Sequence, residues 1–179
     1  MQSQPILPTE RIRLVPLSAG HLEHLAGLSA DPEVMRYLGG VLTREQAAEE
    51  LRTTLAYAAD GLGCWTGFVD GGFAGFWSLR PGEFPRQAEL GYRLLRAHWR
   101  QGLAKEGARE LLRHGFQDVG LGRIFARTAA ANKGSQATMA SLGLRHVRDF
   151  VADPGYFAPG DDPHAVEYAV GREEWLARG

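Results

Sequence analysis

The sequence predicts an α/β (α+β) domain, in which a mixed, mostly antiparallel sheet of six to seven strands is flanked by about four helices. Strand-like and helix-like periodicities follow one another in the order β-α-α-β-β-β-α-β-α-β-β. Two strand-like runs meet at Gly71-Gly72, as in a β-hairpin. Hydrophobic residues make up 44% of the 179 residues, enough for one buried core. Because no repeat or linker divides the chain, we expect a tail over residues 1–8 and a single domain over residues 9–176.

The first third of the chain contains one predicted strand, the first two helices of this order, and a further short helix between those two. Polar and apolar residues alternate over 11–17, which indicates a strand. Leucines at helical spacing from Leu22 predict a helix. Asp31-Pro32-Glu33 combines a cap, a first-turn proline and an acid, and predicts a short helix over 32–38. The capping box Thr43-x-x-Gln46 predicts a longer helix of four to five turns that ends near Leu62.

The rest of the chain is dominated by strands. The predicted strands cover 64–70, 73–79, 88–95, 123–131, 144–150 and 165–170. A helix is expected from Gly102 to about Val119, closed by Gly120, and a second from Asn132 to about Leu142. A loop rich in Gly, Pro and Asp follows over 151–163.

Composition limits the kinds of partner that we expect. No apolar run reaches the length of a membrane helix, and the first residues lack the pattern of a signal peptide, so we expect a cytoplasmic protein with no membrane contact. A single cysteine, Cys64, excludes a disulfide framework and argues against a metal cage. Residues 93–148 hold eleven Lys/Arg and three acids, which fits either a solvated helix face or a site for a polyanionic ligand. No basic stripe interleaved with aromatics indicates nucleic acid.

The most informative stretch runs from Trp99 to Ala104, between a predicted strand and a predicted helix. A helix start carries unpaired N–H groups and a partial positive charge. The small residues Gly102 and Ala104 leave that backbone uncovered, so a phosphate group could approach it closely. A plain tight turn that opens a surface helix is the alternative interpretation of this stretch.

Four segments in this order and spacing resemble the GCN5-related N-acetyltransferase (GNAT) superfamily. They are TERIRLVPLSAGHLEHLAGLSADPEVMRYLGG, QAELGYRLLRAHWRQGLAKEGARELLRHGF, ANKGSQATMASLGL and EYAVGREEW. The resemblance extends over roughly residues 9–176 and is greatest to the branch that includes the ribosomal-protein N-terminal acetyltransferases. It implies the GNAT fold, acetyl-coenzyme A as co-substrate, and transfer of the acetyl group to an amine.

The resemblance also implies which residues hold coenzyme A. The family's Arg/Gln-x-x-Gly-x-Gly/Ala loop falls on residues 99–104, with Trp99 in place of the usual Arg/Gln and Arg100 where a glycine is common. Backbone N–H groups of this loop would bind the pyrophosphate. Asn132 would bond the pantetheine arm, or serve as a helix cap, and the backbone of Leu94 would pair with the pantetheine amides. The predicted cofactor-binding set is Leu94, Trp99, Arg100, Gln101, Gly102, Leu103, Ala104, Asn132 and Ser135.

Two residues are predicted to act in catalysis. An ammonium group must lose a proton before it can attack a thioester, so a base is needed. Glu89 is the candidate base, on the opposite face of its strand from Leu90; an exposed strand glutamate is the alternative. Many relatives carry a tyrosine that protonates the leaving thiolate, where this chain has Met139. Ser135 or water would take that role, although Ser135 also fits a surface serine.

The leading hypothesis is therefore an acetyl-coenzyme A-dependent N-acetyltransferase that uses no metal and acts by direct transfer. Its acceptor would be a protein N-terminus, a polyamine, an amino acid or a drug-like amine. A non-catalytic module that binds acyl-coenzyme A is the alternative. A dinucleotide-binding oxidoreductase ranks well below both, because no Gly-x-Gly-x-x-Gly follows the first strand. Either a monomer or a homodimer is compatible with the sequence.

Overall fold

Eight strands form one sheet in the order β1-β2-β3-β4-β5-β6-β8-β7, and all neighbours are antiparallel except β5 and β6. The computed structural model describes residues 3–178. The strands are β1 (Leu7–Pro8), β2 (Arg13–Pro16), β3 (Gly63–Val69), β4 (Gly72–Pro81), β5 (Gln87–Leu94), β6 (Arg123–Ala129), β7 (Arg145–Val151) and β8 (His164–Gly171). The helices are α1 (Leu22–Ser29), α2 (Arg44–Ala56), α3 (Leu103–Arg113), α4 (Lys133–Ser141) and α5 (Arg172–Leu176).

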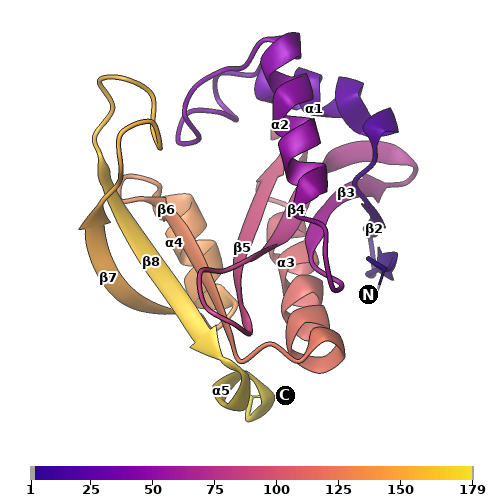
Figure 1. The fold of residues 1–179 in the computed structure, drawn as a ribbon, viewed down its shortest axis with the longest axis vertical. Helices are drawn as coiled ribbons and strands as arrows, with labels where there is room; N and C mark the ends of the chain where they lie inside the picture. Colours follow the sequence, from indigo (N-terminus) through magenta and orange to yellow (C-terminus); the bar gives the residue numbers. More distant parts are fainter. Residues whose placement is uncertain (1–2, 179) are drawn as a thin grey trace.

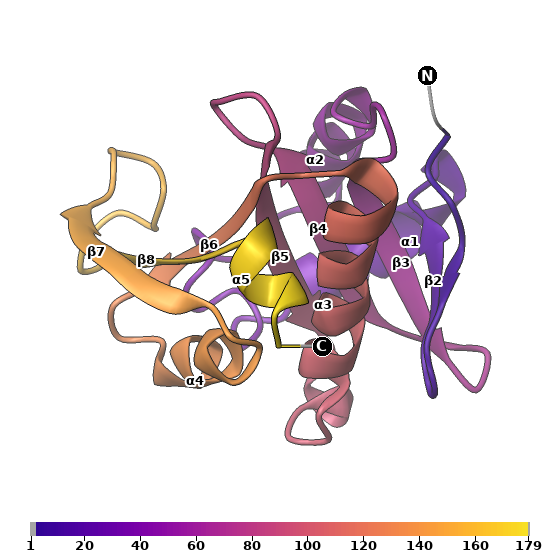
Figure 2. The ribbon, with the colours of Figure 1, turned by 90° about the horizontal axis from the view of Figure 1, so that it is seen from below.

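Helices cover the sheet on both faces. Helices α1 and α2 lie on one face, and α3 and α4 lie on the other (Figures 1 and 2). The larger core cluster fills the space beneath α3, where Trp77 and Leu79 of β4 meet Leu111 and Leu112. Side chains of α1 and α2 form a second cluster with the opposite side of β3 and β4. The predicted α/β domain with a mostly antiparallel sheet is confirmed, with one strand more than the upper estimate.

The local signals for turns and caps were reliable. Thr43 Oγ1 accepts from the Gln46 N–H, and Thr43 N–H donates to Gln46 Oε1, so the predicted capping box begins α2. Asp70 and Gly71 both have positive φ, as a tight hairpin turn between β3 and β4 requires.

Three features differ from the sequence-based expectation. Residues 32–38 form successive turns instead of a helix: Gly39 and Gly40 adopt positive φ directly afterwards, and so short a helix is marginal without packing on several sides. Helix α2 ends at Ala56, well before Leu62, because Asp60 and Gly61 reverse the chain with positive φ. Strand β1 and helix α5 were not predicted.

Strand β1 lies inside residues 1–8, the segment assigned to a tail. Leu7 pairs with Leu14 of β2 and is 4% exposed, so the sheet begins before residue 9. No helix in the described part of the chain is long and apolar enough to span a bilayer.

The sheet opens between β5 and β6. These two parallel strands pair only over three positions, from Gln87↔Arg123 to Glu89↔Phe125. Beyond Glu89, β5 continues beside β4, whereas β6 turns away with β8 and β7 (Figure 1). The last part of β5 therefore has a neighbour on one side only.

Candidate active site

The unpaired side of β5 presents backbone groups to the gap. In an antiparallel ladder, alternate residues direct their N–H and C=O groups to opposite sides. Gly82 N–H donates to the Gln87 carbonyl and Leu95 N–H donates to the Ala74 carbonyl, so the odd-numbered residues of β5 bond to β4. Tyr92 and Leu94 therefore direct their backbone groups into the gap.

The side chain of Trp99 forms a hydrogen bond with one of these backbone groups. Its indole Nε1 donates to the Leu94 carbonyl at 2.9 Å, which fixes the loop to the end of β5. The Leu94 N–H still faces the gap, and the Leu94 side chain is buried in the core. Leu94, whose backbone the resemblance assigns to the pantetheine amides, therefore lies at the gap with its carbonyl already bonded within the protein.

The loop before α3 contains two residues with positive φ. Gly102 has φ +76° and precedes the first helical residue, Leu103. Arg100 has φ +57°, a region that favours glycine, at the position where the family commonly has one. Among residues 3–178 no side chain caps this helix start, so the N–H groups of residues 103–105 point outward from the first turn.

Arg11 holds this loop in place, a role that the sequence did not signal. Its Nη1 donates to the Gln101 carbonyl at 2.8 Å, and its Nε donates to Glu106 Oε2 at 2.7 Å. Glu106 also accepts from Thr9 Oγ1 at 2.6 Å. Burial acts to raise the pKa of Glu106, but these hydrogen bonds from Thr9 and Arg11 outweigh it and lower that pKa. The β1–β2 turn is thereby fixed to the start of α3, beside Gly102.

Asn132 and Ser135 lie across the gap from β5. Asn132 is the N-cap of α4, and its Oδ1 accepts from the Ser135 N–H at 3.2 Å. The Ser135 Oγ lies 3.4 Å from the Tyr92 hydroxyl, so α4 and β5 are linked at this point. Burial raises the pKa of Tyr92, which keeps the phenol protonated. The structure brings these residues together, and the part played by Tyr92 carried no signal in the sequence.

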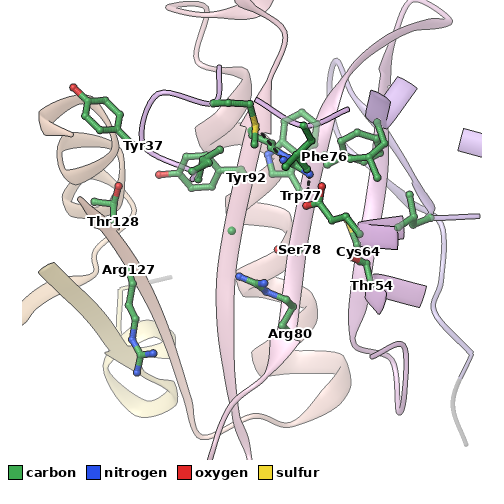
Figure 3. Close-up of a pocket in the computed structure, with 18 of the residues that line it drawn as sticks. Tyr37, Thr54, Cys64, Phe76, Trp77, Ser78, Arg80, Tyr92, Arg127 and Thr128 are labelled. Atoms are coloured by element: carbon green, nitrogen blue, oxygen red, sulfur yellow. Dashed lines mark hydrogen bonds and ion pairs between the residues drawn. The ribbon is translucent and has the colours of Figure 1, made fainter. Parts of the chain in front are cut away.

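A cavity of about 310 Å³ lies on the face of β4 and β5 that α1 and α2 cover, opposite the face that packs against α3 (Figure 3). The floor is formed by alternate side chains of the two strands, including Phe76, Ser78 and Arg80 of β4. Two loops also contribute lining residues. Tyr37 comes from the loop between α1 and α2, and Tyr156 comes from the loop between β7 and β8. The two loops that line the cavity are therefore far apart in sequence.

Glu89 lies beside this floor and is not one of the residues that line the cavity. It pairs across the strands with Arg80, with 3.6 Å between Arg80 Nη2 and Glu89 Oε2, and its side chain is 20% exposed. It shares a strand face with Gly91 and Arg93, which line the cavity, and this is the face opposite Leu90 that the sequence predicted. Burial and the charge of Glu89 together raise the pKa of Tyr156, so that phenol lies within electrostatic reach of Glu89.

Cys64 lies in the cavity wall but is not suited to act as a nucleophile. Its side chain is buried, and desolvation raises the pKa of the thiol to about 12. The reactive form of cysteine is the thiolate, which is scarce at neutral pH with such a pKa. Within residues 3–178, no three His, Cys, Asp or Glu side chains are grouped so as to hold a metal ion.

Comparisons with known proteins identify the family to which the chain belongs. A family model described as an acetyltransferase (GNAT) domain matches residues 11–145. The chain is 39% identical to the FsC-acetyl coenzyme A-N(2)-transacetylase of Aspergillus fumigatus, over 98% of this chain and 80% of the fungal protein. The structure is similar to that of a GNAT-family acetyltransferase from Bacillus anthracis, with a TM-score of 0.82 at 22% identity, covering 95% of this chain and 100% of that one.

A second similar structure was solved with coenzyme A. It is RimL, a ribosomal L7/L12 alpha-N-protein acetyltransferase, with a TM-score of 0.82 at 16% identity, covering 93% of this chain and 98% of RimL. At such identities, RimL and the Bacillus protein show a common fold. The family match and the fungal relative go further, and they show that this chain is an acyltransferase enzyme that belongs to the GNAT family of acetyltransferases.

Proposed function

We propose that the protein transfers the acetyl group of acetyl-coenzyme A directly to a primary amine, in the cytoplasm. The observation that carries this proposal is the divergence of β5 and β6 after Glu89. It exposes the backbone of Tyr92 and Leu94 between the uncapped start of α3 and the cavity beneath α1 and α2. One ligand could thus bind its phosphates at Gly102 and extend its acyl end along β5.

The residues present fit such a ligand. The N–H groups at the start of α3 would bind the pyrophosphate, because a helix start favours negative charge. Arg100 and Lys105 add positive charge at this end of the helix. The N–H of Leu94 would bond the pantetheine arm as an added strand does, and Asn132 would approach the same arm from α4.

In the reaction, the acceptor nitrogen forms a bond to the acetyl carbon while the carbon–sulfur bond breaks. Glu89 takes the proton that the ammonium group must lose, directly or through water. After the nitrogen has bonded to the acetyl carbon it carries one more proton, which it loses to water as the carbon–sulfur bond breaks. The thiolate takes up one proton from water, directly or through the Ser135 hydroxyl, which gives a proton to the sulfur and regains one from water. The Ser135 Oγ lies 3.4 Å from the Tyr92 hydroxyl on this side of the gap. Because the Cys64 thiol stays protonated, no acetyl-cysteine intermediate is expected.

The test is an assay of thiol release with acetyl-coenzyme A and a panel of primary amines, combined with mass spectrometry of the amine. Amine-dependent thiol release with an acetylated product is expected. Binding of acetyl-coenzyme A by calorimetry without thiol release from any amine would favour the non-catalytic alternative. Failure of acetyl-coenzyme A to bind at millimolar concentration would contradict the proposal entirely.

A further inference from the structure

Three arginines line the cavity, and two of them are already bonded to carboxylates. Arg93 Nη2 donates to Glu50 Oε1 at 2.6 Å. Arg127 Nε donates to Glu167 Oε2 at 3.0 Å. Figure 3 shows the Arg127 guanidinium directed away from Tyr92. Glu50 thus balances the charge of Arg93, whereas Arg127 is held on Glu167 together with Arg123 and Arg148.

Arg80 differs from the other two. Within residues 3–178 its guanidinium makes no hydrogen bond, and Glu89 Oε2 lies 3.6 Å away, too far for one. Figure 3 shows its side chain extending from β4 towards β5 along the cavity floor. The side chain is 46% exposed and lines the cavity, so N–H donors of its guanidinium are available to a ligand there. A guanidinium with free donors therefore stands beside the candidate base.

The floor next to this pair carries a hydroxyl group. One cross-strand position further along, Ser78 faces Gly91, and Ser78 Oγ occupies the space over Gly91, where a Cβ atom would come within 2.8 Å of it. Successive positions on one face of a strand are about 7 Å apart. A small group bound against the Ser78 hydroxyl would therefore lie next to Glu89 and Arg80.

We propose that the acceptor is an α-amino acid or its amide, and that Arg80 binds the carboxyl-derived oxygen on the carbon that carries the reacting amine. This inference rests on the proposed function. In such a compound the nitrogen and the carboxyl carbon are about 2.5 Å apart, because one carbon joins them. An ammonium group against Glu89 thus places a carboxylate against Arg80, and each charge meets its opposite.

Other amines fit this pair poorly. A polyamine or a plain alkylamine would satisfy Glu89 but leave Arg80 without an acceptor, and a polyamine would also bring like charge towards it. Beyond Gly91 the cavity lining includes the apolar side chains of Leu25, Met35 and Phe76, together with the Arg93–Glu50 ion pair. The apolar part of this lining offers contacts for an α-amino acid with an apolar side chain.

The experiment compares three probes that share one side chain: L-leucine, L-leucinamide and 3-methylbutylamine. Calorimetric titrations use the protein with and without coenzyme A, so that no acetyl transfer occurs. In Arg80→Gln, the dissociation constant for leucine should rise at least about tenfold, because a charge-assisted bond is lost. It should rise by a smaller factor for leucinamide and stay within about twofold for 3-methylbutylamine. Arg52→Gln, an exposed arginine on α2, is the matched control and should change none of them.

Three results would overturn the inference: equal losses for all three probes, binding of 3-methylbutylamine alone by the wild type, or no binding of leucine and leucinamide at tens of millimolar. Equal losses would mean that Arg80 acts only through Glu89 or the local fold. Because these titrations need no turnover, they are independent of the thiol-release assay that tests the proposed function. Acetylation of 3-methylbutylamine without recognition of leucine would preserve that function and reject the substrate class.

Discussion

The indole Nε1 of Trp99 donates to the carbonyl of Leu94 at 2.9 Å, across the short turn that joins β5 to the loop before α3. This bond ties the loop to the end of the open strand. It also leaves the Leu94 N–H as the remaining backbone group of that residue that faces the gap. The position of the phosphate-binding loop and the position of the open strand are therefore coupled through one side chain.

Trp99→Phe should raise the KM for acetyl-coenzyme A with little change in kcat. The substitution keeps an apolar ring but removes the donor, at a cost of about 1 kcal/mol for the unpaired carbonyl. The catalytic candidates Glu89 and Ser135 lie outside this loop and should keep their positions. Steady-state kinetics with acetyl-coenzyme A as the varied substrate measures KM and kcat separately. A fall in kcat by the same factor as the rise in KM would contradict a role limited to the loop.

Gly102 provides a test of the proposed phosphate cradle. It has φ +76°, and Gly120, at the far end of the following helical segment, has φ +79°. Alanine at either position costs about 1 kcal/mol of stability, because a Cβ atom disfavours this region. Only Gly102→Ala should also weaken acetyl-coenzyme A binding, since it adds a Cβ beside the exposed N–H groups.

Calorimetric titration of the two glycine variants with acetyl-coenzyme A separates these effects. The expected loss of affinity is about tenfold or more for Gly102→Ala, the scale of one strong bond to a phosphate, and none for Gly120→Ala. Urea unfolding shows whether the two variants lose comparable stability. Equal affinities of the two variants for acetyl-coenzyme A would show that the loop at Gly102 is not part of the binding site.

Glu89→Gln tests the base. The amide keeps the shape of the side chain but cannot take a proton, so kcat should fall at least about tenfold, while acetyl-coenzyme A binds as before. Glu83→Gln, in the exposed turn between β4 and β5, is the control and should leave kcat unchanged. Unchanged turnover in Glu89→Gln would remove this residue from the role and leave proton removal to water.

Sequence reasoning located the features that depend on neighbouring residues. The capping box at Thr43 and the cap at Asn132 are local, because each side chain bonds to the backbone three residues away. The loop at Gly102 could be located because glycine and a helix start are visible in one short segment. Glu89 could be placed on the correct strand face, since alternation alone determines it.

The remaining features depend on register and packing, which a single sequence does not display. Arg80 and Glu89 face each other only because β4 and β5 pair in one particular register. Tyr92 meets Ser135 because α4 packs across the gap after β6 has diverged. Arg11 reaches Glu106 over 95 positions of sequence. None of these pairings leaves a local signal, and all three lie in or beside the candidate site.

The contact between Tyr92 and Ser135 predicts coupled effects on turnover. If the two hydroxyls together return a proton to the thiolate, Ser135→Ala and Tyr92→Phe should each lower kcat several-fold, and the double variant should lose no more than the larger single effect. The reason is that either substitution already breaks the 3.4 Å contact. Kinetics of the three variants measure the coupling. Fully additive losses would show that the hydroxyls act independently.

The cluster around Glu167 predicts how stability depends on pH. This carboxylate is 5% exposed and accepts from Arg123, Arg127 and Arg148 at 2.9, 3.0 and 3.2 Å. Burial acts to raise the pKa of Glu167, but the three guanidinium groups outweigh it and lower that pKa. A lowered pKa in the folded state means that the carboxylate stabilises the fold above the unfolded-state pKa of about 4.3. That stabilisation is lost as the pH falls through the folded-state pKa.

Glu167→Gln should therefore be destabilised most at neutral pH and should approach the wild type as the pH falls below about 4. Urea unfolding at a series of pH values measures this difference. Glu23→Gln is the control, because Glu23 pairs with Arg44 on the surface, where an ion pair contributes little to stability. A difference between Glu167→Gln and wild type that does not change with pH would mean that Glu167 stabilises the sheet by packing, and that its charge contributes nothing. Convergence at low pH would show that the charge joins β6, β7 and β8 into one unit behind the open gap.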